Sequence, residues 1–78
     1  MKHDITHHLN LREMNAPITL IKVMQAFGRI NAGEILEIMG NDVQTRKYLF
    51  KVLDASRYEL ISSRDDLAFY QVLLRKRH

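Results

Sequence analysis

The spacing of apolar residues changes back and forth along this chain, and that limits the folds it can adopt. Leu9 and Leu11 lie two residues apart, which predicts a short strand over residues 9–12. From Pro17 onward, apolar residues recur three and four positions apart on one face of an expected helix: Leu20, Ile21, Met24, Phe27 and Ile30. Such a chain buries its apolar side chains by packing helices against a sheet.

A second helix is expected after a central strand. Residues 34–39 are rich in Ile and Leu, which is typical of a buried strand. Either Asp42 with Thr45 or Asn41 with Gln44 offers a cap at the start of the helix. The helix should run to about residue 54, with a buried stripe of Val43, Tyr48, Leu49, Val52 and Leu53.

Two further strands complete the expected order. Residues 58–63 and 69–74 predict strands, and the polar turn at residues 64–66 between them indicates an antiparallel hairpin. The order is therefore β-α-β-α-β-β. Because both helices are amphipathic, each should bury one stripe against the same face of a mixed four-stranded sheet. The expected fold class is α+β, a two-layer α/β sandwich.

The chain is expected to be a single domain over residues 1–78, with residues 1–6 frayed and residues 77–78 a tail. With both helices on one side, the other face of the sheet is left uncovered. Apolar side chains on such a face often mark an oligomer or partner interface, so a homodimer through it is a further expectation. The residues that alternation places there are Ile35, Met39 and one set from residues 69–72.

The start of the first helix is the most informative site in the sequence. Free backbone N–H groups and the helix dipole make such a start a place where a thiolate or another anion is stabilised. Asn15 is the expected cap, with Pro17 in the first turn. The chain has no cysteine, and Ala16 stands where a reactive side chain would lie. Arg12, Asn15, Ala16 and Pro17 remain candidates for an anion site.

Residues 9–19 form a motif that can be compared with known families. They read Leu-Asn-Leu-Arg-Glu-Met-Asn-Ala-Pro-Ile-Thr, which resembles the Leu-Asp-x-x-Gly-x-x-Cys-Pro-x-Pro motif that opens the TusA/SirA-like sulfur-carrier family. The likeness continues to residue 76 without gaps. Its further matching positions are Gly33-Glu34, Leu36, Ile38, Asp42, Glu59-Leu60 and Leu73-Leu74-Arg75-Lys76. The resemblance implies the two-layer fold expected above.

The departures from the motif fall on its chemistry. In the family, the cysteine holds a persulfide that passes between protein partners in tRNA thiolation and related sulfur pathways. Ala16 takes its place here and can neither ionise nor accept sulfur. Glu13 replaces a Gly, Thr19 replaces the second Pro, and Phe50 replaces a Pro that many members have in the second helix. These joint changes favour a natural divergent paralogue over an engineered cysteine-to-alanine variant.

The resemblance therefore implies a non-catalytic protein-binding or regulatory module rather than an enzyme, with a partner from a sulfur-transfer system. The family docks on acidic patches of its partners through a basic surface beside the cysteine. Lys22, Arg46 and Lys47 are the candidates for that surface, and ordinary solvated helix faces are the alternative for each. Residual sulfur transfer with a cysteine supplied by the partner is another hypothesis.

A nucleic-acid-binding module is the alternative function, less favoured than a protein-binding one. The chain has a net charge of +3, and a basic cluster at residues 75–77 could act with the open sheet face. Such a module would lose affinity steeply as the salt concentration rises.

Other classes of function are not expected. No window is apolar for long enough to span a membrane, and the N-terminus is too polar for a signal peptide, so the expectation is a cytoplasmic protein without a membrane partner. His3, His7 and His8 have a spacing that could hold a metal on a helix. On a strand, however, His7 and His8 point to opposite faces, so no metal and no cofactor are expected.

Overall fold

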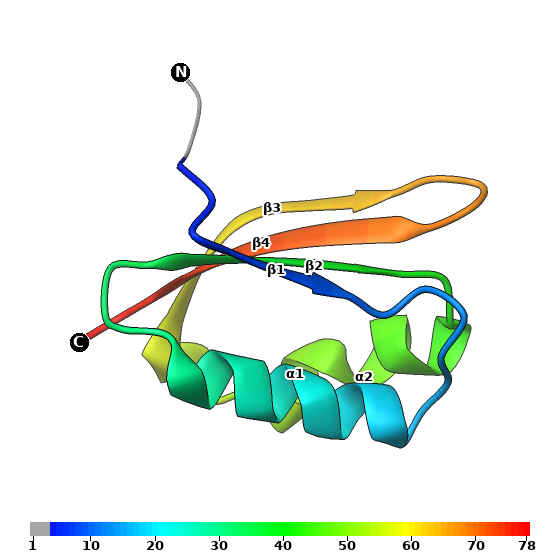
Figure 1. Ribbon diagram of the computed structural model, residues 1–78, viewed down its shortest axis with the longest axis horizontal. Coiled ribbons are helices and arrows are strands. Elements are labelled where there is room, and N and C mark those ends of the chain that lie inside the picture. Colours follow the sequence, from blue (N-terminus) through cyan, green and yellow to red (C-terminus); the bar gives the residue numbers. More distant parts are fainter. Residues whose placement is uncertain (1–3) are drawn as a thin grey trace.

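The computed structural model describes residues 4–78, and its elements follow the predicted order (Figure 1). They are β1 (His7–Asn10), α1 (Ile18–Arg29), β2 (Ile35–Gly40), α2 (Val43–Val52), the short 3₁₀ helix η1 (Ala55–Arg57), β3 (Tyr58–Asp65) and β4 (Tyr70–Lys76). The four-stranded sheet has the order β1-β2-β4-β3. β1 runs parallel to β2, whereas β4 is antiparallel to both β2 and β3.

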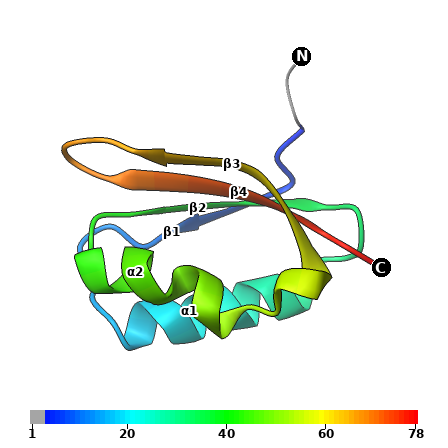
Figure 2. The same cartoon turned by 180° about the vertical axis from the view of Figure 1, so that it is seen from behind.

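Both helices cover the same face of the sheet, as the views from opposite sides show (Figure 1, Figure 2). The predicted two-layer α+β fold with a mixed sheet and a C-terminal hairpin is therefore confirmed. Within residues 4–78, no helix is both long and apolar enough to cross a membrane.

The core lies between the helices and the two central strands. Leu36 pairs with Leu74 and Ile38 with Val72 across β2 and β4, and all four side chains are buried. Because side chains alternate along a strand, these residues share the face that the helices cover. The remaining core members are Leu11, Val23, Phe27, Ile30, Leu49, Leu53, Tyr58 and Tyr70.

The buried stripe of α1 differs from the predicted one. Phe27 and Ile30 are buried as predicted, but Ile21 and Met24 are 52% and 51% exposed, and Val23 is fully buried in their place. The sequence of α1 has apolar residues at helical spacing on two overlapping faces, and Phe27 belongs to both. Spacing alone could not decide which face meets the sheet. The buried residues within α1 are Thr19, Val23 and Phe27.

The stripe of α2 was also predicted only in part. Leu49 is buried as expected, but Val43 is 79% exposed, Tyr48 is exposed too, and the polar Thr45 is fully buried. The helix ends at Val52, shortly before the expected boundary. Thr45 is tolerated in the interior because its hydroxyl has hydrogen-bond partners, described below.

The N-termini of the two helices are capped in different ways. At α2 the prediction of Asp42 as cap is confirmed, since its carboxylate accepts a hydrogen bond of 3.2 Å from the Gln44 N–H. At α1 the prediction of Asn15 as the side-chain cap is wrong. Pro17 occupies the cap position without a side-chain hydrogen bond, and Asn15 contributes only its backbone carbonyl, 3.4 Å from the Thr19 nitrogen.

The ends of the described chain are more ordered than expected. β1 lies earlier than the predicted strand because its parallel register with β2 begins at His7, opposite Leu36. Residues 1–3 of the segment expected to be frayed lie outside the described residues, but Thr6 donates from its N–H and its hydroxyl to the Ile35 carbonyl. Residue 77, expected in the tail, donates from its backbone N–H to the Arg57 carbonyl, 2.8 Å away.

Candidate functional site

The β1–α1 loop, which contains Ala16, approaches the β2–α2 connection at one end of the molecule (Figure 1). Its backbone N–H donates a hydrogen bond of 2.7 Å to the carboxylate of Asp42. The peptide bond between Ala16 and Pro17 is cis. The N–H at the predicted anion site is therefore already satisfied, and the anion that it binds belongs to the protein.

Asp42 is the centre of this site. Besides the Ala16 N–H, its carboxylate accepts hydrogen bonds from the Gln44 N–H at 3.2 Å and from the Thr45 hydroxyl at 2.8 Å. Hydrogen bonds to the charged form favour it, so the pKa of Asp42 lies below its ordinary value, with the Ala16 N–H as the largest cause. One carboxylate thus caps α2 and fastens the segment before α1.

Two buried threonines continue this network into the helix layer. The hydroxyls of Thr19 and Thr45 are hydrogen-bonded to each other, and both side chains are fully buried. Because Thr45 donates its only hydroxyl proton to Asp42, the Thr19 hydroxyl must be the donor to Thr45. Thr19 stands at the position of the motif's second proline, which has no hydroxyl. The substitution therefore joins α1 to α2 through a polar contact that proline could not make.

Arg12 and Asn15 do not complete an anion site. The Arg12 backbone N–H and its Nε both donate to the Asn10 side-chain oxygen, at 3.0 and 3.2 Å, which holds the guanidinium beside β1. Asn15 is exposed. Of the four predicted residues, only Ala16 and Pro17 lie directly at the helix start. The backbone N–H of Ala16 already donates to Asp42.

Glu13 has a backbone φ of 70°, in the left-handed region that favours glycine, and it lies at the motif's glycine position. We expect Glu13→Gly to stabilise the protein by about 0.5–1 kcal/mol. A non-glycine residue at positive φ costs roughly 1–2 kcal/mol. The greater conformational freedom of glycine in the unfolded chain offsets only part of this gain. Urea denaturation gives the measurement. Arg12→Gly is the matched control and should destabilise; equal effects of the two changes would contradict the prediction.

Of the three predicted docking cations, Arg46 is engaged within the protein, whereas Lys22 and Lys47 are exposed. Arg46 faces β3, where its Nε lies 2.9 Å from the Asp65 carboxylate and its Nη2 donates to the Ser63 hydroxyl. Lys22 and Lys47 are exposed on the outside of α1 and α2. Of the three predicted cations, these two form no ion pair among residues 4–78 and lie on neighbouring helices.

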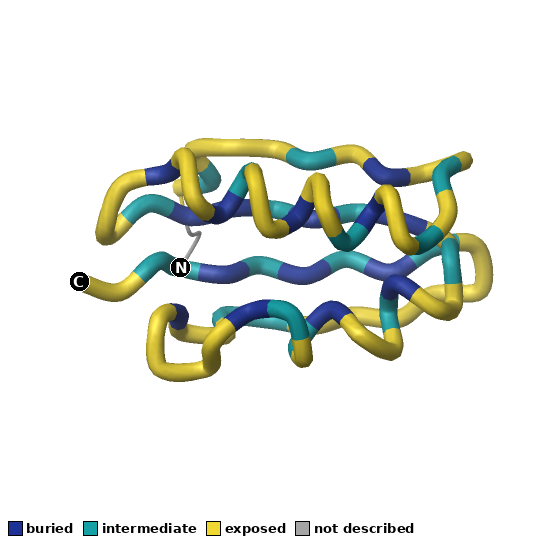
Figure 3. Tube along the Cα trace, turned by 90° about the horizontal axis from the view of Figure 1, so that it is seen from below, coloured by how far each residue is buried: buried dark blue, intermediate teal, exposed yellow. Residues whose placement is uncertain are grey.

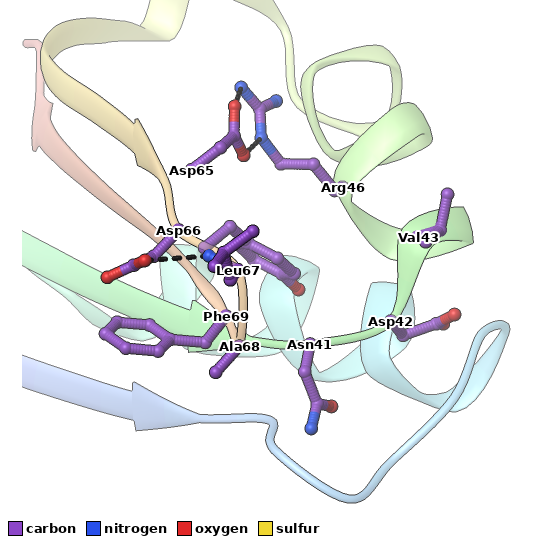
Figure 4. A pocket seen from close by; sticks show the side chains of 10 residues that line it. Asn41, Asp42, Val43, Arg46, Asp65, Asp66, Leu67, Ala68 and Phe69 are labelled. Atoms are coloured by element: carbon purple, nitrogen blue, oxygen red, sulfur yellow. Dashed lines mark hydrogen bonds and ion pairs between the residues drawn. The ribbon is translucent and has the colours of Figure 1, made fainter.

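A cavity of about 200 Å³ lies beside this end, between the start of α2 and the β3–β4 turn (Figure 4). Val43 and Leu67 are both on its wall, and Leu67 is fully exposed. Turn residues give no periodic signal, so the sequence did not single out Leu67. We define the Ala16 end as Ala16, Pro17, Val43 and Leu67.

Tyr70 also borders this cavity and is almost fully buried. Its hydroxyl has no hydrogen-bond partner among the described residues. Burial raises the pKa of Tyr70 to about 12, with a smaller contribution from the charge of Asp42. The phenol is therefore neutral at physiological pH and serves as a core side chain.

The basic cluster at residues 75–77 is part of the fold. Arg75 forms an ion pair of 3.1 Å with Glu59. The Lys76 Nζ donates to the carbonyls of Phe27 and Ile30, both at 3.0 Å, so it caps the end of α1. Arg77 donates from its Nε to the Tyr58 carbonyl, also at 3.0 Å. A nucleic acid would have to compete with these contacts, which weighs against the alternative function.

The open face of the sheet is more polar than expected. Ile35 and Met39 fall on this face by alternation, but Ile35 is 4% exposed. Near the centre, the Glu37 carboxylate is hydrogen-bonded to His8 and to the Gln71 amide, each at 2.6 Å. The homodimer expected through this face stays a prediction.

The histidines do not come together. His7 pairs with Glu34 at 3.1 Å, whereas His8 pairs with Glu37, and His3 lies outside the described residues. Among residues 4–78 there is no group of three or more side chains suited to hold a metal ion.

Comparison with known proteins agrees with the motif and the fold. The family model for sulfurtransferase TusA matches residues 7–76. No curated protein matches the chain. The match includes β1, both helices and the hairpin, and therefore the whole region around Ala16.

Proposed function

This chain belongs to the TusA family and has no cysteine, so it cannot itself carry a persulfide; we propose that it is a non-catalytic module that binds a protein partner. The partner would belong to a sulfur-trafficking or tRNA-thiolation system in the cytoplasm. The observation that supports this most is the Ala16 site. The fold of the family is retained around Ala16, but the backbone N–H of Ala16 is hydrogen-bonded to the Asp42 carboxylate.

The Ala16 end offers a surface for such a partner. Val43 and Leu67 expose apolar side chains to solvent, and the cavity between them is open to a protruding side chain. Burial of apolar area of this kind is the main favourable term in protein association. Lys47 lies one helical turn beyond Val43 and is exposed, which would favour an acidic rim on the partner.

Capture of the partner by photocrosslinking in extract of the native cells tests this function. We expect a specific, saturable crosslinked protein, and Leu67→Ser should reduce its yield at least about tenfold, because an exposed apolar anchor at an interface contributes on the order of 1.5–3 kcal/mol. Leu60→Ser, at an exposed apolar residue on β3, is the matched control and should leave the yield unchanged. A failure to find a saturable partner, or equal losses in both variants, would contradict the proposal.

A further inference from the structure

The two helices have an unusual distribution of charge. Neither α1 nor α2 contains an aspartate or a glutamate, and all nine carboxylate residues of the chain lie outside them. The acidic residues next to α2 in sequence, Asp42 and Asp54, accept hydrogen bonds from the Gln44 and Ser56 N–H groups. Within their own bounds the two helices therefore present only neutral and basic side chains, whereas the exposed Asp54 follows α2 and borders a hollow that Met24 also lines.

The cations of this layer are available. Lys22, Arg29, Lys47 and Lys51 are exposed, and none of the ion pairs found among residues 4–78 includes any of them. Arg46, the fifth cation, is engaged by Asp65 at the edge of the layer. Four positive charges thus lie on two helices that contain no carboxylate.

Apolar side chains are exposed among these cations. Ile18, Ile21 and Met24 lie three residues apart and form a ridge along α1, each more than half exposed. On α2 the exposed ring of Tyr48 lies between two ammonium groups, 5.5 Å from Lys47 and 5.1 Å from Lys51. We define the helix face as these six residues together with Lys22 and Arg29. The outward stretches of both helices are exposed side by side (Figure 3).

We propose that the helix face binds the surface of a lipid bilayer that contains anionic lipids. Basic residues near such a surface are attracted by its negative potential, and exposed apolar side chains enter the headgroup region. Tyr48 suits that boundary because its ring is apolar and its hydroxyl is polar. This proposal differs from the expectation of no membrane partner, which rested on the lack of a long apolar segment and did not consider surface binding.

The extent of the carboxylate-free area favours a bilayer over a protein. A planar surface faces both helices at once, so a single aspartate or glutamate within either helix would be repelled. An acidic protein contacts a limited area and can match a carboxylate with its own lysine. A nucleic acid would use the cations but would leave the ridge of Ile18, Ile21 and Met24 without an apolar contact.

Flotation with vesicles tests this binding, using vesicles of phosphatidylcholine alone and of phosphatidylcholine with an equal part of phosphatidylglycerol. We expect the protein to float only with the anionic vesicles. The double variant K47Q/K51Q should lower the partition coefficient about 25-fold, since each basic residue near the surface contributes about fivefold. Ile21→Ser should lower it about tenfold through lost insertion.

The controls separate this surface from general effects. Arg64→Gln and Leu60→Ser remove a cation and an apolar side chain from β3 and should leave flotation unchanged, and circular dichroism of every variant should match the parent. Three outcomes would overturn the proposal: no flotation, equal flotation with neutral vesicles, or loss in K47Q/K51Q but none in Ile21→Ser. The last, together with binding to polyglutamate, would assign the face to an acidic protein.

Discussion

Gly40→Ala is expected to destabilise the protein by about 3 kcal/mol, the cost of overpacking a well-filled core. A Cβ at this position would lie 2.7 Å from Cζ and 3.0 Å from Cε2 of Tyr70, and closer still to the hydroxyl oxygen. Gly40 ends β2 opposite Tyr70 in the antiparallel register, and both are buried, so neither can move away without disturbing the sheet. Urea denaturation with circular dichroism gives the free energy of unfolding.

A double-mutant cycle identifies the cause of this loss. In the background of Tyr70→Leu, which removes the ring that the new methyl group meets, Gly40→Ala should cost much less than in the parent, with a coupling energy of about 1–2 kcal/mol. Gly28→Ala is the matched control, because nothing lies within 4 Å of a Cβ there. That change should stabilise the exposed helix position by about 0.5–1 kcal/mol. Additive effects of the Gly40 and Tyr70 changes would contradict the steric explanation.

Asp42→Ala is expected to lower the free energy of unfolding by about 2 kcal/mol at neutral pH, because it removes the cap of α2 together with the acceptor for Ala16 and Thr45. Asp66→Ala is the control. The only hydrogen bond of the Asp66 carboxylate among the described residues is to the Leu67 N–H next to it, and its removal should change stability by less than about 0.5 kcal/mol.

The contribution of Asp42 should also depend on pH. Its pKa is lowered in the folded protein, so folding favours the carboxylate. The stabilisation is therefore fully present above the ordinary aspartate pKa and is lost as the pH falls through the lower folded value. The difference in unfolding free energy between the parent and Asp42→Ala should shrink on acidification over that range. A constant difference from neutral pH into strong acid would show that ionisation of Asp42 does not contribute.

The order of elements could be predicted because it depends on local patterns. The alternation at Leu9 and Leu11, the helical spacing after Pro17 and the cap at Asp42 each reflect neighbours within a few residues. The buried face of α1 could not be predicted, since Ile21 and Val23 are equally apolar and only the position of the sheet distinguishes them. Local pattern thus specifies the type of an element but not always its orientation.

The contacts that define the site come from residues far apart in sequence. Ala16 could be recognised as a missing thiol, but its hydrogen bond to Asp42 joins positions 26 residues apart. Arg46, on α2, was a docking candidate, but its partner is Asp65 on β3, 19 residues further along the chain. The cations of residues 75–77 formed a basic cluster in the sequence, but their acceptors lie on β3, on α1 and at Ile30, directly after α1.

The cap that Lys76 places on α1 has a consequence for synthesis of the chain. The Lys76 ammonium donates to the carbonyls of Phe27 and Ile30, which precede it by 49 and 46 residues. β2 likewise pairs on one side with β4, which follows the other described elements in the chain. The first helix and the central strand therefore leave the ribosome without their final partners. A domain of this topology completes its core only after β4 has emerged, which lengthens the time that its apolar surfaces stay exposed during synthesis.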